Sequence, residues 1–242
     1  GRTHVKRFIE ERQLTVILAI DQSASGAFAS AGRLKSEVAV EVGAVIALAA
    51  TKNNDRVGLA LFTDHVESFV PPRKGRGHIL RLMRDMLEFR PTGRGTDITA
   101  VLRSLRTRLR RRALIFVISD FLAPTTGDHG FDRALRRLAM RHEVIGVRIT
   151  DPRDREMPRV GLVRTTDPES GAFSWIDTSS RAVRRALEAR AAAHDAALAR
   201  ALRRAHVDQI DIRTDAPFVP VLARYFELRE RGRRPSRAGG AR

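Results

Sequence analysis

Oxygen-bearing side chains follow directly after a buried apolar run near the start of the chain. Residues 14–20 are almost wholly apolar and rich in Val and Ile, which is typical of a central strand covered on both faces. Asp21, Ser23 and Ser25 come next, at alternate positions. Carboxylate and hydroxyl oxygens in this arrangement suit a hard divalent cation such as Mg²⁺ or Mn²⁺. We therefore predict that a metal site begins where this strand ends.

Two later segments offer further oxygen ligands. Thr96 follows a turn in which Gly93 and Gly95 permit a sharp backbone, and Asp120 follows the apolar run ALIFVIS. A lone D-x-S-x-S run is a weak signal, but three matches in order, two of them at the ends of predicted strands, are far more specific. The predicted metal ligands are Asp21, Ser23, Ser25, Thr96 and Asp120.

This set of residues resembles the metal-ion-dependent adhesion site of von Willebrand factor type A domains, which combines a D-x-S-x-S run with a later Thr and a second Asp. The resemblance implies a bound Mg²⁺ or Mn²⁺ with one coordination position open. In that family an Asp or Glu of a partner protein fills the open position. The alternative is that these residues only cap helices and end strands, without a metal.

Within that fold the chain resembles the bacterial family called domain of unknown function fifty-eight. The matching pieces span nearly all of residues 5–234, and they include VKRFIEER, DQSAS, ISDF, RHEVIGVRITDP, TDPESG and FELRERGRR. Members are commonly encoded beside MoxR-type AAA+ ATPases, so the resemblance implies such an ATPase, or a client that it remodels, as the partner. Family members usually have a further N-terminal region, and the first residue here is not Met, which is consistent with a segment cut from a longer chain.

Predicted strands alternate with predicted helices along the chain, which indicates an α/β fold. We expect a doubly wound, mostly parallel six-stranded sheet with one antiparallel edge strand and helices on both faces, of the von Willebrand A or Rossmann-like type. The edge strand, residues 66–70, should end at Pro71 and Pro72. The predicted strands are 14–20, 57–62, 66–70, 114–119, 143–149 and 207–212, and the predicted helices are 33–51, 77–89, 98–110, 131–140, 180–205 and 218–230.

The expected domain organisation is a single large unit with short flanking segments. Residues 1–12 are a polar lead-in, residues 13–230 form the domain, and residues 231–242 are a basic tail that we expect to be disordered. A β-hairpin insertion, about residues 153–178, interrupts the alternation with strands at 160–164 and 172–176.

The net charge of +17 invites a nucleic-acid-binding hypothesis. Against it, Arg and Ala are abundant together throughout the chain, and aromatic residues make up only 5% of it, so stacking platforms are scarce. The chain has no Cys and no signal peptide, and its most apolar helical segment is too short to span a bilayer, so we expect a cytoplasmic protein.

Other residues with chemical potential have ordinary explanations. We expect Asp97 to cap a helix or support the ligands rather than bind the metal, and Asp64 and His65 to belong to a turn. His142 should be structural, and His194 a partly buried or solvated residue rather than a ligand. No pattern of an enzyme active site is present in the sequence, so we predict a metal-dependent protein-interaction module. The alternatives are an arginine-driven nucleic-acid-binding module and a metal-dependent phosphoesterase.

Overall fold

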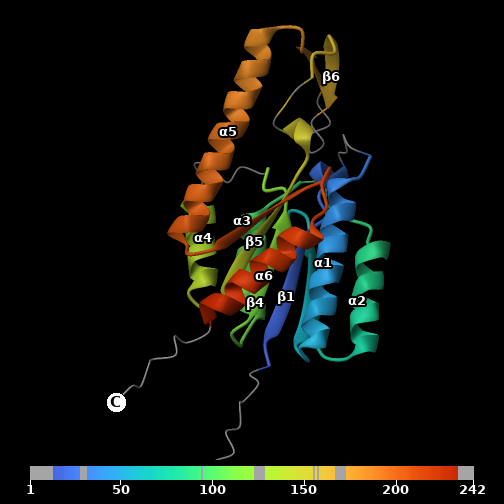
Figure 1. Cartoon of the computed structure of the whole chain (residues 1–242), viewed down its shortest axis with the longest axis vertical. Coiled ribbons are helices and arrows are strands. Elements are labelled where there is room, and N and C mark those ends of the chain that lie inside the picture. The colour runs from blue at the N-terminus through green and yellow to red at the C-terminus, as the bar shows by residue number, and fades with distance from the viewer. Residues whose placement is uncertain are drawn as a thin grey trace, which may run out of the picture.

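The computed structural model describes residues 13–27, 32–93, 95–122, 129–154, 156, 158–166 and 173–233. At its centre is a six-stranded sheet with the strand order β3-β2-β1-β4-β5-β8 (Figure 1). The strands of the sheet are β1 (Thr15–Asp21), β2 (Arg56–Phe62), β3 (Val66–Arg73), β4 (Leu114–Ser119), β5 (Glu143–Thr150) and β8 (Asp208–Arg213). The sheet confirms the predicted doubly wound α/β fold.

All neighbouring strands are parallel except β3, which pairs antiparallel with β2 at one edge. The prediction that Pro71 and Pro72 end this strand is wrong, because β3 continues through both prolines to Arg73. Proline lacks an N–H donor, and an edge strand tolerates it because one side of the strand needs no hydrogen-bond partner. The register shifts between Val57 and Leu59, opposite the prolines, which indicates a β-bulge.

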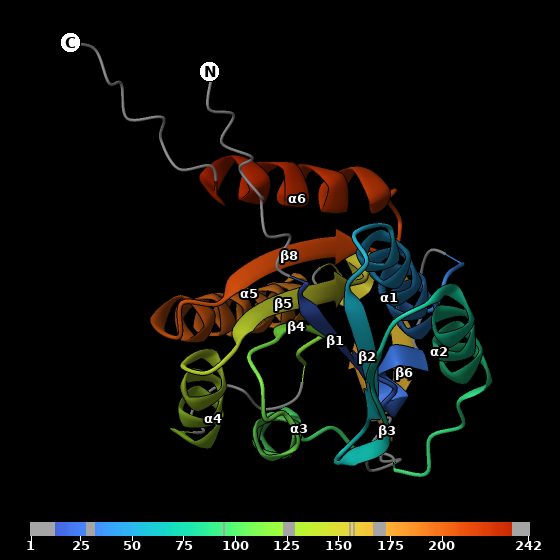
Figure 2. The same ribbon diagram turned by 90° about the horizontal axis from the view of Figure 1, so that it is seen from below.

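Helices cover both faces of the sheet (Figure 2). On one face, α1 (Lys35–Lys52), α2 (Arg76–Glu88) and α6 (Val219–Arg233) pack against side chains such as Leu18 and Ile20. On the other, α3 (Ile98–Arg108), α4 (His129–Ala139) and α5 (Arg181–Arg204) pack against Ile17 and Ala19. Successive residues of β1 therefore serve opposite faces, as the period of a strand requires.

A close approach fixes α1 on the sheet beside the end of β1. A Cβ added at Gly43 would lie 2.7 Å from Cδ1 of Ile20 and 3.3 Å from the sulfur of Met86. A larger residue at this position would therefore require Ile20 to shift, so glycine suits the close packing of α1 on the sheet.

The predicted hairpin insertion is present as a separate two-stranded antiparallel sheet of β6 (Leu162–Thr166) and β7 (Phe173–Asp177). It lies beyond the carboxyl ends of the central strands, next to the start of α5 (Figure 1). The short helix η2 (Pro152–Asp154) leads from β5 toward it. The lead-in 1–12 and residues 234–242 of the predicted tail lie outside the described residues, and α6 extends to Arg233, into the segment predicted as tail.

Within the described ranges, every helix is too short or too polar to cross a lipid bilayer.

Candidate functional site

The two central strands β1 and β4 bring the first and last predicted ligands to the same edge of the sheet. The chain order of the strands reverses between β1 and β4, and ligands of doubly wound sheets bind at the carboxyl ends of the strands at such a point. The register pairs Ile20 with Ile118, so Asp21 and Ser119 follow side by side. The hydroxyl of Ser119 donates a 2.6 Å hydrogen bond to Oδ2 of Asp21.

The serines of the D-x-S-x-S run are held next to Asp21 by a tight turn. The backbone N–H of Ser23 donates to Oδ1 of Asp21 over 2.9 Å, and the short helix η1 (Ala24–Ala27) begins at the next residue. The hydroxyls of Ser23 and Ser25 lie 3.1 Å apart, with Ser23 buried. Oxygens of Asp21, Ser23 and Ser25 are thus adjacent, as the sequence pattern predicts.

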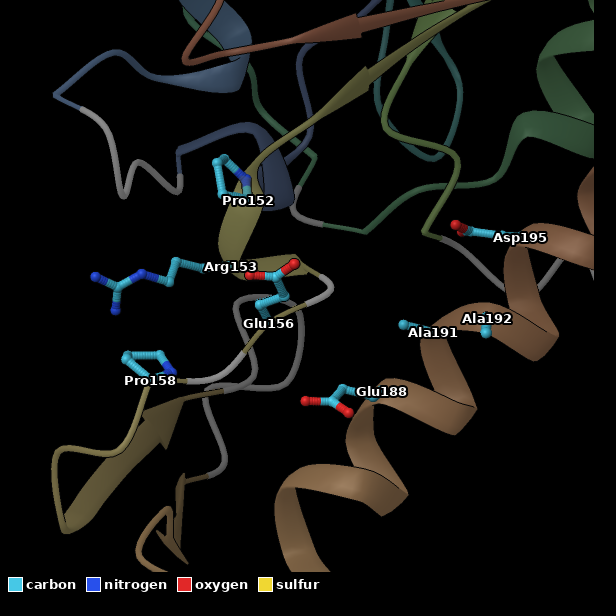
Figure 3. Close-up of a pocket in the computed structure, with 8 residues that line it drawn as sticks. All are labelled: Pro152, Arg153, Glu156, Pro158, Glu188, Ala191, Ala192 and Asp195. Carbon is cyan, nitrogen blue, oxygen red and sulfur yellow. The ribbon is translucent and has the colours of Figure 1, made fainter. Parts of the chain in front are cut away.

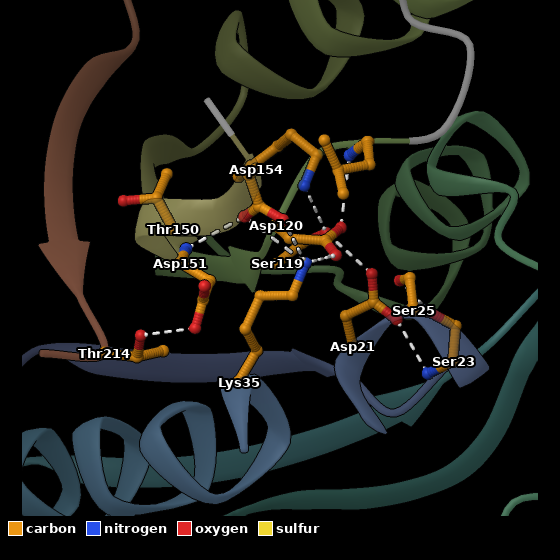
Figure 4. Close-up of polar contacts among 12 residues, drawn as sticks. Asp21, Ser23, Ser25, Lys35, Ser119, Asp120, Thr150, Asp151, Asp154 and Thr214 are labelled. Atoms are coloured by element: carbon orange, nitrogen blue, oxygen red, sulfur yellow. Dashed lines mark hydrogen bonds and ion pairs between the residues drawn. The ribbon is translucent and has the colours of Figure 1, made fainter. Parts of the chain in front are cut away.

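A buried lysine, Lys35, lies beside Asp120 and Asp154 (Figure 4). Nζ of Lys35 lies 2.9 Å from Oδ2 of Asp120, and it also lies 3.2 Å from Oδ1 of Asp154. The side chain of Lys35 is only 3% exposed. Sequence reasoning missed this ion-pair cluster, because Lys35 is separated from Asp120 and Asp154 by 85 and 119 positions. The available signal is a lysine near the start of a helix that has few charged residues.

The carboxylates of this cluster perturb one another. Burial, together with the nearby charge of Asp120, raises the pKa of Asp21 to about 6 from its ordinary value of 3.8. Burial works to lower the pKa of Lys35, but the Asp120 and Asp154 carboxylates outweigh it, and the pKa of Lys35 is raised. A carboxylate with a raised pKa is one whose charge is poorly compensated, so the site favours an additional cation.

A strained turn directly after Asp120 fixes the orientation of its carboxylate. Phe121, which follows it, has a φ of 54°, a left-handed conformation that is uncommon for a bulky residue. The N–H of Phe121 donates to the hydroxyl of Ser119, the N–H of Leu122 donates to Oδ1 of Asp120, and Nε2 of His194 lies 2.7 Å from the carbonyl oxygen of Phe121. These bonds hold the turn, and His194 is partly buried, which is one of the two positions predicted for it.

The loop that carries Thr96 is attached to the end of β2, the other neighbour of β1. The N–H of Asp97 donates to the carbonyl oxygen of Thr63, and Glu67 accepts hydrogen bonds from Thr63, from the hydroxyl and N–H of Thr92 and from the N–H of residue 93. Burial alone would raise the pKa of Glu67, but these hydrogen bonds outweigh it and lower the pKa to about 2. Thr96 therefore lies at the same edge of the sheet as Asp21, whose strand neighbour is Phe62.

Thr96 belongs to the loop beside the candidate site, and its hydroxyl is buried. The cavity between Asp21, Ser25, Lys35 and Asp120 has a volume of about 10 Å³, and Thr96 does not line it. Oγ1 of Thr96 is buried, and within the described part of the chain it has no hydrogen-bond partner. Such an orphaned hydroxyl is a group that needs an explanation, and a ligand is one.

The donor set fits a small, hard divalent cation. Its members are carboxylate and hydroxyl oxygens, and a cavity of about 10 Å³ is on the order of what one water molecule or ion requires. Among the residues described, no group of three or more His, Cys, Asp or Glu side chains has a metal-binding arrangement, so a metal here would depend on the hydroxyls. The feature that does not fit is Lys35, which already supplies one positive charge.

The remaining predicted roles agree with the structure. Asp97 caps α3 by accepting a hydrogen bond from the N–H of Ala100, and Asp64 contacts His65 within the turn after β2. His142 is buried, and its pKa is lowered by burial and by the neighbouring Arg141. These residues are structural in the way that the sequence predicts.

A larger open hollow of about 700 Å³ lies between the segment after β5 and α5 (Figure 3). Its walls carry charges of both signs, including Arg153, Glu156 and Glu188. None of the predicted metal ligands lines it, so it is distinct from the candidate site.

The sheet order, the antiparallel edge strand and the helices on both faces define a doubly wound, mostly parallel α/β domain. The chain belongs to the family described as Protein of unknown function DUF58, whose family model matches residues 1–197. The Uncharacterized protein Rv1480 of Mycobacterium tuberculosis is 34% identical over 231 residues, which are 95% of this chain and 71% of that protein. The resemblance stated from the sequence is thereby confirmed at the level of the family.

Two solved structures share the fold at low sequence identity. The conserved hypothetical protein BatB from Bacteroides thetaiotaomicron superimposes with a TM-score of 0.56 at 15% identity, covering 90% of this chain and 98% of that chain. An aerotolerance-related membrane protein from Bacteroides fragilis gives the same TM-score and identity, with 90% and 99% covered. At this identity the likeness concerns the fold alone.

Proposed function

We propose that the carboxyl edge of the central sheet is a docking site that binds a partner protein through a divalent cation, Mg²⁺ or Mn²⁺. The cation is held by Asp21, Ser23, Ser25, Thr96 and Asp120, and an Asp or Glu of the partner completes its coordination. The observation that carries this proposal is the convergence of the D-x-S-x-S run with the end of β4, where Ser119 and Asp21 are hydrogen-bonded across 98 positions of sequence.

The chemistry of the edge supports a binding role over a catalytic one. The described residues around Asp21 and Asp120 offer a lysine ion pair and hydroxyls, and no imidazole lines their cavity as a general base. A bound cation supplies a Lewis-acidic position for an incoming carboxylate. The protein residues orient that cation and exclude water from one side of it. The module that we propose is therefore not an enzyme.

The partner class follows from the family resemblance. We propose a MoxR-type AAA+ ATPase, or a client that it remodels, as the protein that supplies the acidic side chain. The process would be chaperone-like assembly or remodelling, in which an ATPase acts on a protein held by this domain.

The test is a pull-down with the purified partner ATPase, in Mg²⁺ or Mn²⁺ and again in EDTA. We expect capture only with the metal, and we expect Asp21→Asn to abolish both Mn²⁺ binding and capture while the fold persists. Asp64→Asn is the matched control, because Asp64 is an exposed carboxylate in the turn after the neighbouring strand and should not affect capture. Normal capture by folded Asp21→Asn would refute the proposal.

Two further assays test the alternatives. A nucleic-acid-binding module would bind DNA or RNA with a steep salt dependence and would ignore EDTA. A phosphoesterase would hydrolyse a generic phosphoester with Mg²⁺ or Mn²⁺ and lose this turnover in Asp120→Asn.

A further inference from the structure

Lys35 is a buried cation that forms ion pairs with carboxylates of the candidate site. It begins α1, where the helix dipole disfavours a cation, and its side chain is almost completely buried. A buried ammonium at such a position is stable only because carboxylates surround it. Asp120 and Asp154 both contact it.

We propose that Lys35 is an internal cation that competes with the divalent metal for Asp120, and that Asp154 retains the ammonium when a metal binds. This inference rests on the proposed function for the identity of the competing ligand. The inference adds that Lys35 is the residue that sets the affinity of the site for the divalent metal.

The geometry makes the exchange a small movement. Nζ of Lys35 lies 2.9 Å from Oδ2 of Asp120, and it lies 3.2 and 3.4 Å from the two oxygens of Asp154. A slight rotation of the flexible lysine side chain therefore releases Asp120 without leaving the ammonium unpaired. Asp154 is itself fixed, because its Oδ2 accepts a 2.8 Å hydrogen bond from the N–H of Asp151.

The local charge also favours a further cation. The buried carboxylates at this edge include Asp21, Asp120 and Asp151, and the ammonium of Lys35 contacts Asp120 and Asp154. A divalent ion held by Asp120 would have the same sign of charge as this ammonium, so the two would repel each other and the position of Lys35 would affect how tightly the metal binds.

The test measures Mn²⁺ affinity by the electron paramagnetic resonance signal of free Mn²⁺, with thermal unfolding as a second readout. Lys35→Met keeps an unbranched side chain, one heavy atom shorter, and removes the charge, and we expect its Mn²⁺ dissociation constant to fall at least tenfold. Lys52→Met is the matched control, because Lys52 lies exposed at the other end of the same helix and should leave the affinity unchanged.

A second variant tests the role of Asp154 as a positioning residue. Asp154→Asn keeps an oxygen for the N–H of Asp151 but removes the charge that retains the ammonium. We expect it to weaken Mn²⁺ binding severalfold in the wild-type background and to have no effect in the Lys35→Met background. A purely structural role would give the same change in both backgrounds.

Each outcome decides between the two hypotheses. Mn²⁺ binding by Lys35→Met but not by the wild type supports Lys35 as the resident cation and contradicts metal-dependent capture. Equal binding by both overturns the role of Lys35 and leaves the proposed function intact. Binding by neither overturns both. If Lys35→Met unfolds without metal, millimolar Mn²⁺ should refold it, and failure to refold would count against the inference.

Discussion

The raised pKa of Asp21 predicts that this carboxylate destabilises the metal-free fold at neutral pH. Its pKa is 3.8 in an ordinary setting and about 6 in the folded chain, where it is 7% exposed and near Asp120. Between these values the folded state retains a proton that the unfolded state releases. The free energy of unfolding therefore falls as the pH rises from about 4 to 6, and the loss is complete above the folded pKa.

The magnitude follows from the shift. A change from 3.8 to about 6 corresponds to roughly 3 kcal/mol, as an upper value, of unfavourable interaction by the ionised carboxylate. Asp21→Asn removes this charge. It retains an oxygen for the N–H of Ser23 and an amide that can pair with the hydroxyl of Ser119. We therefore expect Asp21→Asn to be more stable than the wild type by up to about 3 kcal/mol at pH 8 in EDTA.

The assay is urea unfolding followed by circular dichroism at intervals from pH 4 to pH 8 in EDTA. The difference between Asp21→Asn and the wild type should grow across this range, because other titrating groups are shared by the two proteins and cancel. Asp64→Asn is the control. The hydrogen bond to His65 lowers the pKa of this exposed carboxylate, so the stability of Asp64→Asn relative to the wild type should not rise between pH 4 and pH 8. A difference for Asp21→Asn that stays constant with pH would refute the reasoning.

Adding Mn²⁺ at pH 8 should then reverse the order of stability. A ligand that binds only the folded state stabilises it by mass action, and only the wild type keeps the carboxylate.

Three further predictions concern the loop of Thr96 and the hairpin. Glu67→Gln should loosen the Thr96 loop at neutral pH, which would be measured as faster amide hydrogen exchange in that loop. In the wild type, exchange in the loop should become faster only as the pH falls from 4.5 toward 2, because the pKa of Glu67 is lowered over this range. Gly93→Ala should destabilise the fold by about 1–3 kcal/mol in urea unfolding, because its Cβ would lie 2.7 Å from a carboxylate oxygen, whereas Gly95→Ala has open space and should change stability by less than about 0.5 kcal/mol. Trp175, the only tryptophan, is 62% exposed, so its emission should resemble that of free tryptophan and be quenched by iodide; a buried-type spectrum would contradict the hairpin structure.

The fold could be predicted from the sequence because its central strands are short apolar runs that end in turn or polar residues. Such runs are buried on both faces, and the helices between them fix a parallel order. β4, for example, has the predicted bounds. β3 differs because the prolines that should end it lie at an edge, and edge position is a property of the assembled sheet.

The candidate site was predictable only where its residues lie next to strand ends. Asp21 and Asp120 follow from the pattern, but the partners of Lys35 depend on how α1 packs on the sheet, which is a property of the assembled fold. The sequence predicts that Gly93 permits a sharp turn of the backbone, but the structure shows a different reason for glycine there. It is needed because a side chain would collide with Thr63 and Asp64, a contact that local sequence does not reveal.

The sign of the local charge makes the cation indispensable to the docking hypothesis. The chain as a whole carries +17, which would attract an acidic partner over long distances. At the candidate site, however, Asp21, Asp120 and Asp154 outnumber Lys35, so a bare Asp or Glu of a partner would be repelled on contact. Arginines elsewhere can speed the encounter, but they do not change this balance. An acidic partner that still docks at this edge in EDTA would therefore have to use a different surface.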